Sequence, residues 1–134
     1  MRLDGTNFPL VWMNYDEGPD HDHDEAFAAF EANLKRGAPF VLLTESAPTE
    51  EHAHGREEEK RISLWMKTHK AELRTRVLAM IVIEPSAARR ATFKAFGVVF
   101  AKVWGYPLKL ASSRDEALEI AAKLLTERAG AATA

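Results

Sequence analysis

The sequence predicts an α/β fold with a four-stranded, mostly parallel sheet and alternating helices. Four short runs rich in apolar, β-branched and aromatic residues alternate with four longer segments of helical periodicity. Strands and helices that alternate at this spacing form parallel sheets with right-handed crossovers. The chain has 134 residues, the usual length of one domain, so we expect a single domain over residues 1–134.

The expected strands differ in the pattern of their apolar residues. They are residues 8–15, 39–44, 77–83 and 107–111. The second and third are apolar at consecutive positions, which is typical of central strands covered on both faces. The fourth alternates apolar and polar side chains, as an edge strand does. The expected central core residues are Trp12, Val41, Leu43, Ile81 and Ile83.

Local start and stop signals bound the expected helices. The first ends at residues 35–37, where two basic residues precede a glycine, and the second runs from about residue 50 to about residue 74. The third lies between an N-cap at Ser86 and Gly105, and a capping box over residues 113–116 starts the fourth. We expect residues 130–134 to form a frayed tail.

Composition and charge exclude several classes of protein. The chain has no cysteine, which excludes thiol catalysis, thiolate metal sites and a disulfide framework. No apolar run reaches the ~18–20 residues of a membrane span, and residues 1–5 lack the apolar core of a signal peptide. The cytoplasm is therefore the expected compartment, with no membrane partner.

The net charge of −2 hides an imbalance between the two halves of the chain. Residues 1–59 carry 14 acids and 4 bases, a net of −10, whereas residues 60–134 carry 6 acids and 14 bases, a net of +8. The halves either attract each other within one fold or form a dipolar surface that steers a charged partner. Basic residues are not interleaved with aromatic ones, so nucleic-acid binding is not expected.

One edge of the sheet is the candidate site. The chain contains no G-x-G-x-x-G, Walker loop, G-x-S-x-G or H-E-x-x-H motif. Loops that follow parallel strands all leave from one edge, where open α/β sheets bind their ligands. The expected loops at this edge are residues 16–22, 45–50, 84–86 and 112–114.

Two His-x-His pairs fall at this edge, His21 with His23 and His52 with His54. With the neighbouring carboxylates they would be reasonable ligands for zinc, the one cofactor considered. The alternative is that they are solvated residues beside helix N-termini, where acidic and polar side chains gather. His69 lies within an apolar stripe instead, so we expect it to pack at the margin of the core.

The helix expected over residues 87–104 has two unusual features. Arg89 and Arg90 lie in its first turn, where cations are unfavourable, so either acids from residues 16–25 or a bound anion must compensate. Val98 and Val99 lie off the inward stripe, which is Phe93, Phe96, Gly97, Phe100, Val103 and Trp104. From this excess we expect a homodimer contact or packing against another helix, rather than a cofactor pocket.

The chain opens its strand–helix series with Phe8-Pro9-Leu10-Val11-Trp12 and closes it with Ala111-Ser112-Ser113-Arg114-Asp115-Glu116-Ala117-Leu118. In this order of elements it resembles the STAS-type fold of the anti-sigma-factor antagonists and the lipid-binding Sec14 domains. In the antagonists a phosphorylatable serine follows a core strand after an aspartate. The nearest counterpart here is Ser46, which follows Glu45, so Ser46 is the candidate phosphosite. A lipid cavity like that of Sec14 needs a longer chain.

These observations predict a small, non-enzymatic, cytoplasmic STAS-like domain that acts through protein–protein contacts, with regulation as its expected role. The alternative is a small-ligand or metal-binding protein that uses the loop edge and its two histidine pairs. An unrecognised enzyme at the same edge is the third possibility.

Overall fold

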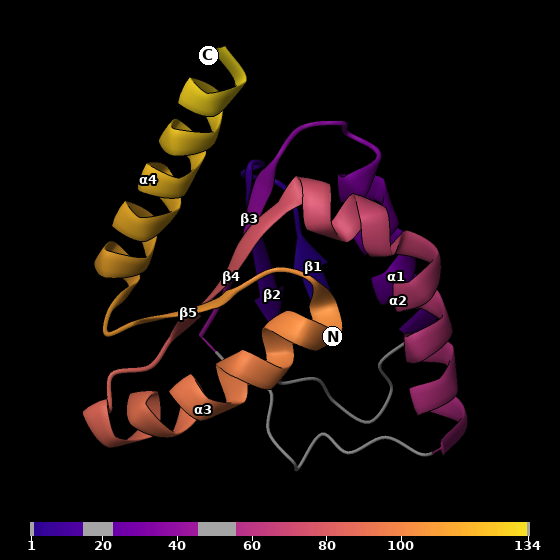
Figure 1. Ribbon diagram of the computed structural model, residues 1–134, viewed down its shortest axis with the longest axis horizontal. Helices are drawn as coiled ribbons and strands as arrows, with labels where there is room; N and C mark the ends of the chain where they lie inside the picture. Colours follow the sequence, from indigo (N-terminus) through magenta and orange to yellow (C-terminus); the bar gives the residue numbers. More distant parts are fainter. Residues whose placement is uncertain (1, 15–22, 46–55, 134) are drawn as a thin grey trace.

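The computed structural model describes residues 2–14, 23–45 and 56–133. Within them the chain forms one sheet and four helices, in the expected alternation (Figure 1). The strands are β1 (Arg2–Asp4), β2 (Leu10–Asn14), β3 (Phe40–Thr44), β4 (Val77–Ile83) and β5 (Leu108–Ala111). The helices are α1 (His23–Leu34), α2 (Arg56–Arg76), α3 (Ala87–Trp104) and α4 (Arg114–Thr133).

The sheet has five strands in the order β1-β2-β3-β4-β5. The strands β2 to β5 pair in parallel, as the sequence predicted, but β1 pairs antiparallel with β2. The expectation of a four-stranded, mostly parallel sheet is therefore wrong in the number of strands, and the sheet is mixed. The three residues of β1 are too few to show the alternation by which a strand is found in a sequence.

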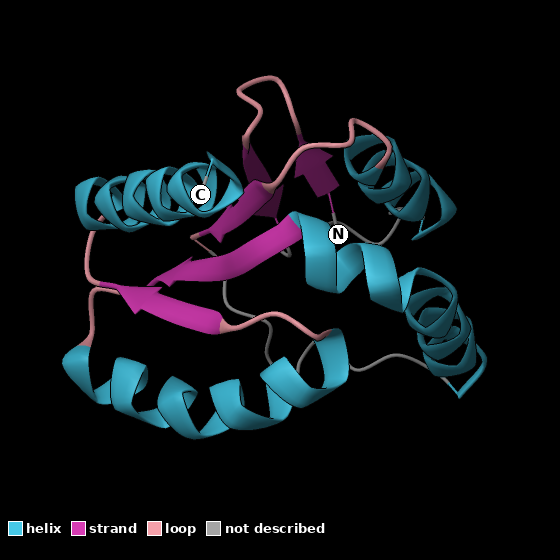
Figure 2. Cartoon of the chain, turned by 45° about the horizontal axis from the view of Figure 1, so that its top comes forward, coloured by secondary structure: helices cyan, strands magenta, loops and turns pink. Residues whose placement is uncertain are grey.

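The order of the parallel strands explains where the helices lie. Each crossover from β2 to β5 moves to the next strand in the same direction, so right-handed crossovers all pass over the same face of the sheet. Accordingly α1, α2 and α3 pack against one face, and α4, which follows the last strand, packs against the other (Figure 2).

Aromatic side chains fill the space between the sheet and α1, α2 and α3. The ring of Phe30 in α1 meets Phe40 of β3 at a centroid distance of 6.4 Å and Trp65 of α2 at 5.1 Å, both nearly edge-on. On the other side of the same layer, Phe100 of α3 meets Tyr106 at 5.5 Å. Phe30 and Phe40 are fully buried. These rings join all three helices to the sheet.

Aliphatic side chains fill the opposite face, beneath α4. The core residues expected there are buried: Val41, Leu43, Ile81 and Ile83. Small side chains at Ala117 and Ala121 of α4 are buried against them.

Trp12 differs from the other expected core residues, because it is only half-buried. Its ring packs at the margin of this cluster, and the guanidinium carbon of Arg114 lies 4.3 Å from the ring centroid. Trp12 therefore packs against this core from its margin, and the expectation of a core residue is met only in part.

The ends of α3 and the start of α4 follow the predicted signals. Ser86 caps α3, with its Oγ accepting a hydrogen bond from the N–H of Arg89 at 3.3 Å, and Gly105 ends the helix with φ of +88°. Ser113 caps α4, with its Oγ accepting from the N–H of Glu116 at 3.2 Å. At the C-terminus, α4 extends to Thr133, and the expected fraying of residues 130–134 stays a prediction. None of the described helices has the length and apolarity needed to cross a membrane.

Candidate functional site

Parallel pairing places the carboxyl ends of β2 to β5 at one edge of the sheet, as the sequence predicted. Among the described residues, one ion pair joins two loops there. Nη1 of Arg114, at the start of α4, lies 3.7 Å from Oε1 of Glu45, the residue after β3. Both side chains are largely exposed, so this pair contributes little to stability.

Arg89 and Arg90 lie at the same edge and hold the turn between β4 and α3. Nη1 of Arg90 donates hydrogen bonds to the carbonyl oxygens of Glu84 at 2.8 Å and Pro85 at 3.0 Å. Nη1 of Arg89 lies 3.6 Å from Oε1 of Glu84. The acid beside Arg89 thus comes from the end of β4, a source that differs from the expected residues 16–25.

Most of the other residues predicted at this edge lie outside the described residues. These are His21, Ser46, His52 and His54; His23 is described only as the first residue of α1. Zinc binding by the histidine pairs and phosphorylation of Ser46 therefore stay predictions. Within the described part of the chain, no three His, Asp or Glu side chains are grouped so that they could hold a metal ion.

His69 packs at the margin of the core, as expected. Its ring centroid lies 4.7 Å from that of Trp65, and its Nε2 lies 3.1 Å from Oε1 of Glu31. The same carboxylate oxygen accepts a hydrogen bond from Nε1 of Trp65 at 2.8 Å. On the other side, Nδ1 of His69 lies 3.4 Å from Oε1 of Glu72. This cluster joins α1 to α2 and has a structural role.

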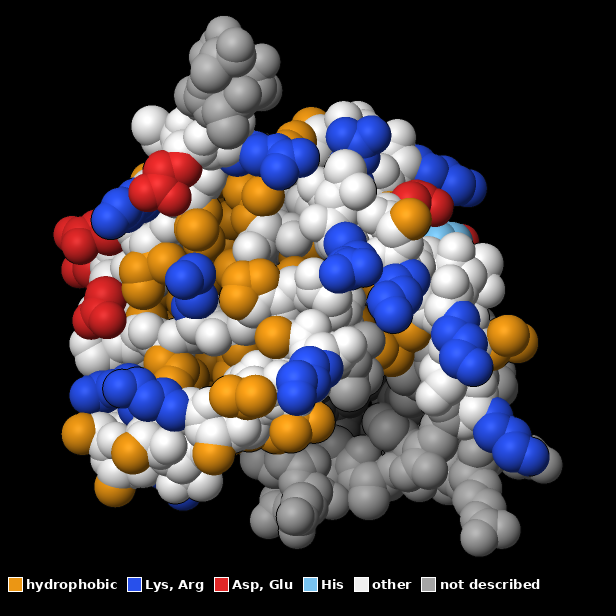
Figure 3. All heavy atoms as spheres, in the orientation of Figure 1, with side chains coloured by type: hydrophobic (Ala, Val, Ile, Leu, Met, Phe, Trp, Pro, Cys, Tyr) orange, Lys and Arg blue, Asp and Glu red, His pale blue; other side chains and the backbone are white. Residues whose placement is uncertain are grey.

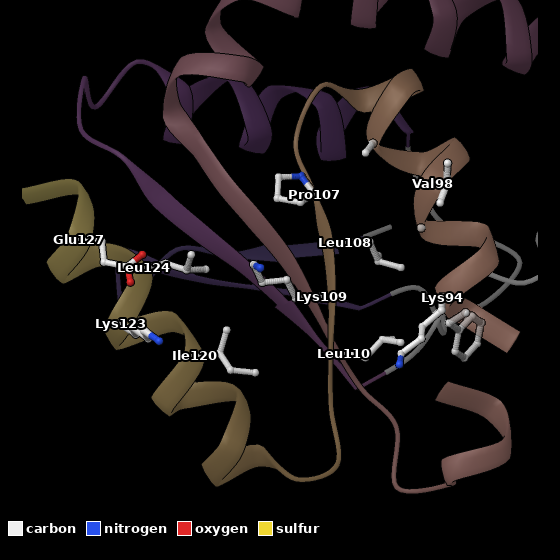
Figure 4. A pocket seen from close by; sticks show the side chains of 13 residues that line it. Lys94, Val98, Pro107, Leu108, Lys109, Leu110, Ile120, Lys123, Leu124 and Glu127 are labelled. Carbon is white, nitrogen blue, oxygen red and sulfur yellow. The ribbon is translucent and has the colours of Figure 1, made fainter. Parts of the chain in front are cut away.

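A groove along the edge strand β5 is the candidate site that sequence analysis did not find. It has a volume of about 680 Å³ and runs between α3 and α4, with β5 as its floor (Figure 4). Hydrophobic side chains gather along it in the space-filling view, with lysine or arginine side chains among them (Figure 3). The residues of its floor are 107–110.

The two walls of the groove have different side chains. The α3 wall consists of Phe93, Lys94, Gly97, Val98 and Ala101. A Cβ atom at Gly97 would lie 3.5 Å from Cδ2 of Leu108, so the helix passes close to the strand at this point. The α4 wall is a stripe at positions i, i+3, i+4 and i+7, which are Ile120, Lys123, Leu124 and Glu127.

Successive side chains of β5 point to opposite walls of the groove. Leu108 and Leu110 point towards α3, whereas Lys109 points towards α4 (Figure 4). This agrees with the pairing, because Leu108 lies beside Met80, a residue of the aromatic core, and Lys109 beside Ile81, a residue of the α4 core. β5 is the last strand in the order of the sheet, so it is an edge strand, as its alternation of apolar and polar side chains predicted.

The groove has an excess of positive charge. Lys94, Lys109 and Lys123 line it, and Glu127 is its one acidic lining residue. No carboxylate of the described residues lies within ion-pair distance of these three ammonium groups. Within the described part of the chain, the three lysines therefore present positive charge without an ion-pair partner beside an apolar surface.

The outer surface of α3 carries further exposed apolar residues. Val98 is 61% exposed, Val99 58% and Phe96 41%. Phe96 was expected on the inward stripe, and its ring does contact Phe100 at a centroid distance of 6.0 Å, but much of it faces solvent. Phe96 and Val99 are three residues apart and share one side of the helix, whereas Val98 lies on the groove side.

No family model matches the chain, and comparison with curated proteins and with solved structures returned no similar protein.

Proposed function

We propose that the protein is a small STAS-like domain without catalytic activity that acts through protein–protein contacts in the cytoplasm and forms a homodimer through α3. The observation that carries the proposal is the exposure of Val99 and Phe96, two large apolar side chains on one side of this helix. Each exposed apolar side chain costs free energy in water, and this cost is recovered when the surface is buried against a partner.

The STAS-like assignment is supported by the order of the elements. Four parallel strands follow each other in sequence order, and each is followed by a helix. This is the βαβαβαβα series on which the resemblance depends. A regulatory role fits a domain whose described surface offers apolar contacts and whose sequence contains no G-x-G-x-x-G, Walker loop, G-x-S-x-G or H-E-x-x-H motif.

The dimer is tested by sedimentation velocity at tens of micromolar protein. We expect the natural chain to sediment as a dimer and the Val99→Glu variant as a monomer, because a carboxylate in an apolar contact is desolvated without a partner. Leu64→Glu is the matched control, since Leu64 is 68% exposed on α2, and this variant should stay dimeric. A monomer for the natural chain would contradict the proposal.

A further inference from the structure

We infer that the groove along β5 binds an extended, acidic segment of a partner protein, which adds to the sheet as a sixth strand. This surface is separate from the proposed dimer contact, because the two use different sides of α3. The inference therefore does not depend on dimerisation.

The backbone of β5 offers hydrogen-bonding groups at its outer side. The carbonyls of Pro107 and Ala111 accept hydrogen bonds from the N–H groups of Met80 and Glu84, both at the inner side, towards β4. Because bonding groups alternate along a strand, residues 107, 109 and 111 bond inward, and the N–H and C=O of Leu108 and Leu110 point outward. No described strand pairs with that side. A partner strand could bond to these groups, as in β-strand addition.

The shape of the groove suits one strand. The floor is the free edge of the sheet, and a helix stands on either side of it (Figure 4). On the α3 side, the wall consists of the small residues Gly97 and Ala101 together with Phe93, Lys94 and Val98. A Cβ atom at Gly97 would lie 3.9 Å from the carbonyl oxygen of Leu108, so α3 passes beside this edge. A single strand added at the edge would lie between the two walls, with its own side chains alternating between them.

The two walls select different side chains. On the α3 side an incoming residue would meet Val98, Leu108 and Leu110, which favour an apolar side chain, with Lys94 on the same wall. On the α4 side it would meet Lys109 and Lys123, which favour a carboxylate. The rest of that wall is Ile120, Leu124 and Glu127, so lysines outnumber acids there by two to one. The groove therefore fits a segment in which apolar and acidic residues alternate.

Charge favours such a segment over a second copy of β5. If two copies of the chain paired edge to edge, each would bring its own Lys109 and Lys123 to the seam. A lysine on an edge strand is a common device against such self-pairing. An acidic strand instead supplies carboxylates to three lysines that form no ion pair among the described residues.

The experiment uses a short fluorescein-labelled peptide of alternating valine and glutamate, and fluorescence anisotropy at low ionic strength with the full chain. We expect saturable binding that weakens with added salt. The Lys109→Glu/Lys123→Glu variant should bind at least about tenfold more weakly, whereas the control Lys67→Glu/Lys70→Glu, two exposed lysines of α2, should bind like the natural chain.

A second pair of variants tests the backbone contact. Leu110→Pro removes an outward N–H and leaves the bonds to β4 in place, which an edge strand tolerates. It should bind about tenfold more weakly than Leu110→Ala, which keeps the N–H. Circular dichroism melts check that both variants fold.

Three results would overturn the inference. The first is that a peptide of alternating valine and lysine binds as tightly as the acidic one. The second is that the Lys109→Glu/Lys123→Glu variant binds the acidic peptide unchanged. The third is that the natural chain does not bind the acidic peptide, while the Lys109→Glu/Lys123→Glu variant differs from the natural chain in oligomeric state. This result would assign the groove to a second copy of the chain. Loss of the dimer in Val99→Glu with intact peptide binding would leave the inference standing.

Discussion

The two faces of the sheet are covered in different ways. Three helices and a layer of aromatic rings cover one face, whereas one helix with small side chains covers the other. The difference follows from topology, since strands in sequence order with right-handed crossovers send every connecting helix to the same face. Only the helix after the last strand is free to cover the second face. α4 therefore covers that face alone, and no described strand pairs with the outer edge of β5.

The largest loss of stability is expected for substitutions in the central strand β4, whose side chains point alternately to the two faces of the sheet. Met80 points to the aromatic face and Ile81 to the α4 face, and both are fully buried. Each replacement by alanine should lower the free energy of unfolding by ~2–5 kcal/mol. Denaturant melts of Met80→Ala and Ile81→Ala measure this. A loss below ~1 kcal/mol for Ile81→Ala alone would mean that α4 does not cover its face.

A smaller loss of stability should show how closely the small side chains of α4 pack against the sheet. Ala121 is fully buried against the sheet, whereas its neighbour Ala122 is exposed. Ala121→Leu should destabilise the protein by ~1–3 kcal/mol, since extra methylene groups must displace packed neighbours. Ala122→Leu is the control and should change the melt little. Equal effects of the two substitutions would show that α4 does not pack closely.

Two glycines of α3 should respond in opposite directions. Gly105 has a positive φ, and a Cβ there would lie 2.6 Å from Cγ of Arg74, so Gly105→Ala should cost ~1–2 kcal/mol. Gly97 is within the helix, and a Cβ there would make only ordinary contacts with Leu108. Gly97→Ala should therefore stabilise the protein by up to about 1 kcal/mol. Thermal melts of the two variants show the sign of each change in stability. A stabilising Gly105→Ala would contradict the positive φ at the end of α3.

The parts of the fold with strong periodicity could be predicted from the sequence. Residues 77–83 and 87–104 have the predicted bounds, because a continuous apolar run and two cap signals define them locally. β1 could not be predicted, since three residues carry no period and the strand exists through its pairing with β2. The contact of Trp12 with Arg114 likewise depends on how β2 and α4 are arranged in space.

The candidate site was predicted less well than the fold. The alternation of Leu108, Lys109 and Leu110 indicated an edge strand, but not that two helices flank it. The groove depends on where α4 crosses the sheet, and the sequence spacing of Ile120, Lys123 and Leu124 shows only that they share a side of a helix. That Lys94, Lys109 and Lys123 form no ion pair among the described residues could be recognised only once the neighbouring elements were in place.

If the outer edge of β5 is free for a partner strand, the backbone amides of Leu108 and Leu110 are open to solvent, and amide hydrogen exchange measured by NMR reports this residue by residue. In the free protein we predict that Lys109 and Ala111 exchange slowly, because their N–H groups bond to β4, while Leu108 and Leu110 exchange fast. Saturation with the valine–glutamate peptide should slow exchange at Leu108 and Leu110 and leave the other two amides unchanged. Slow exchange at Leu108 and Leu110 in the free protein, or no slowing with bound peptide, would contradict the account.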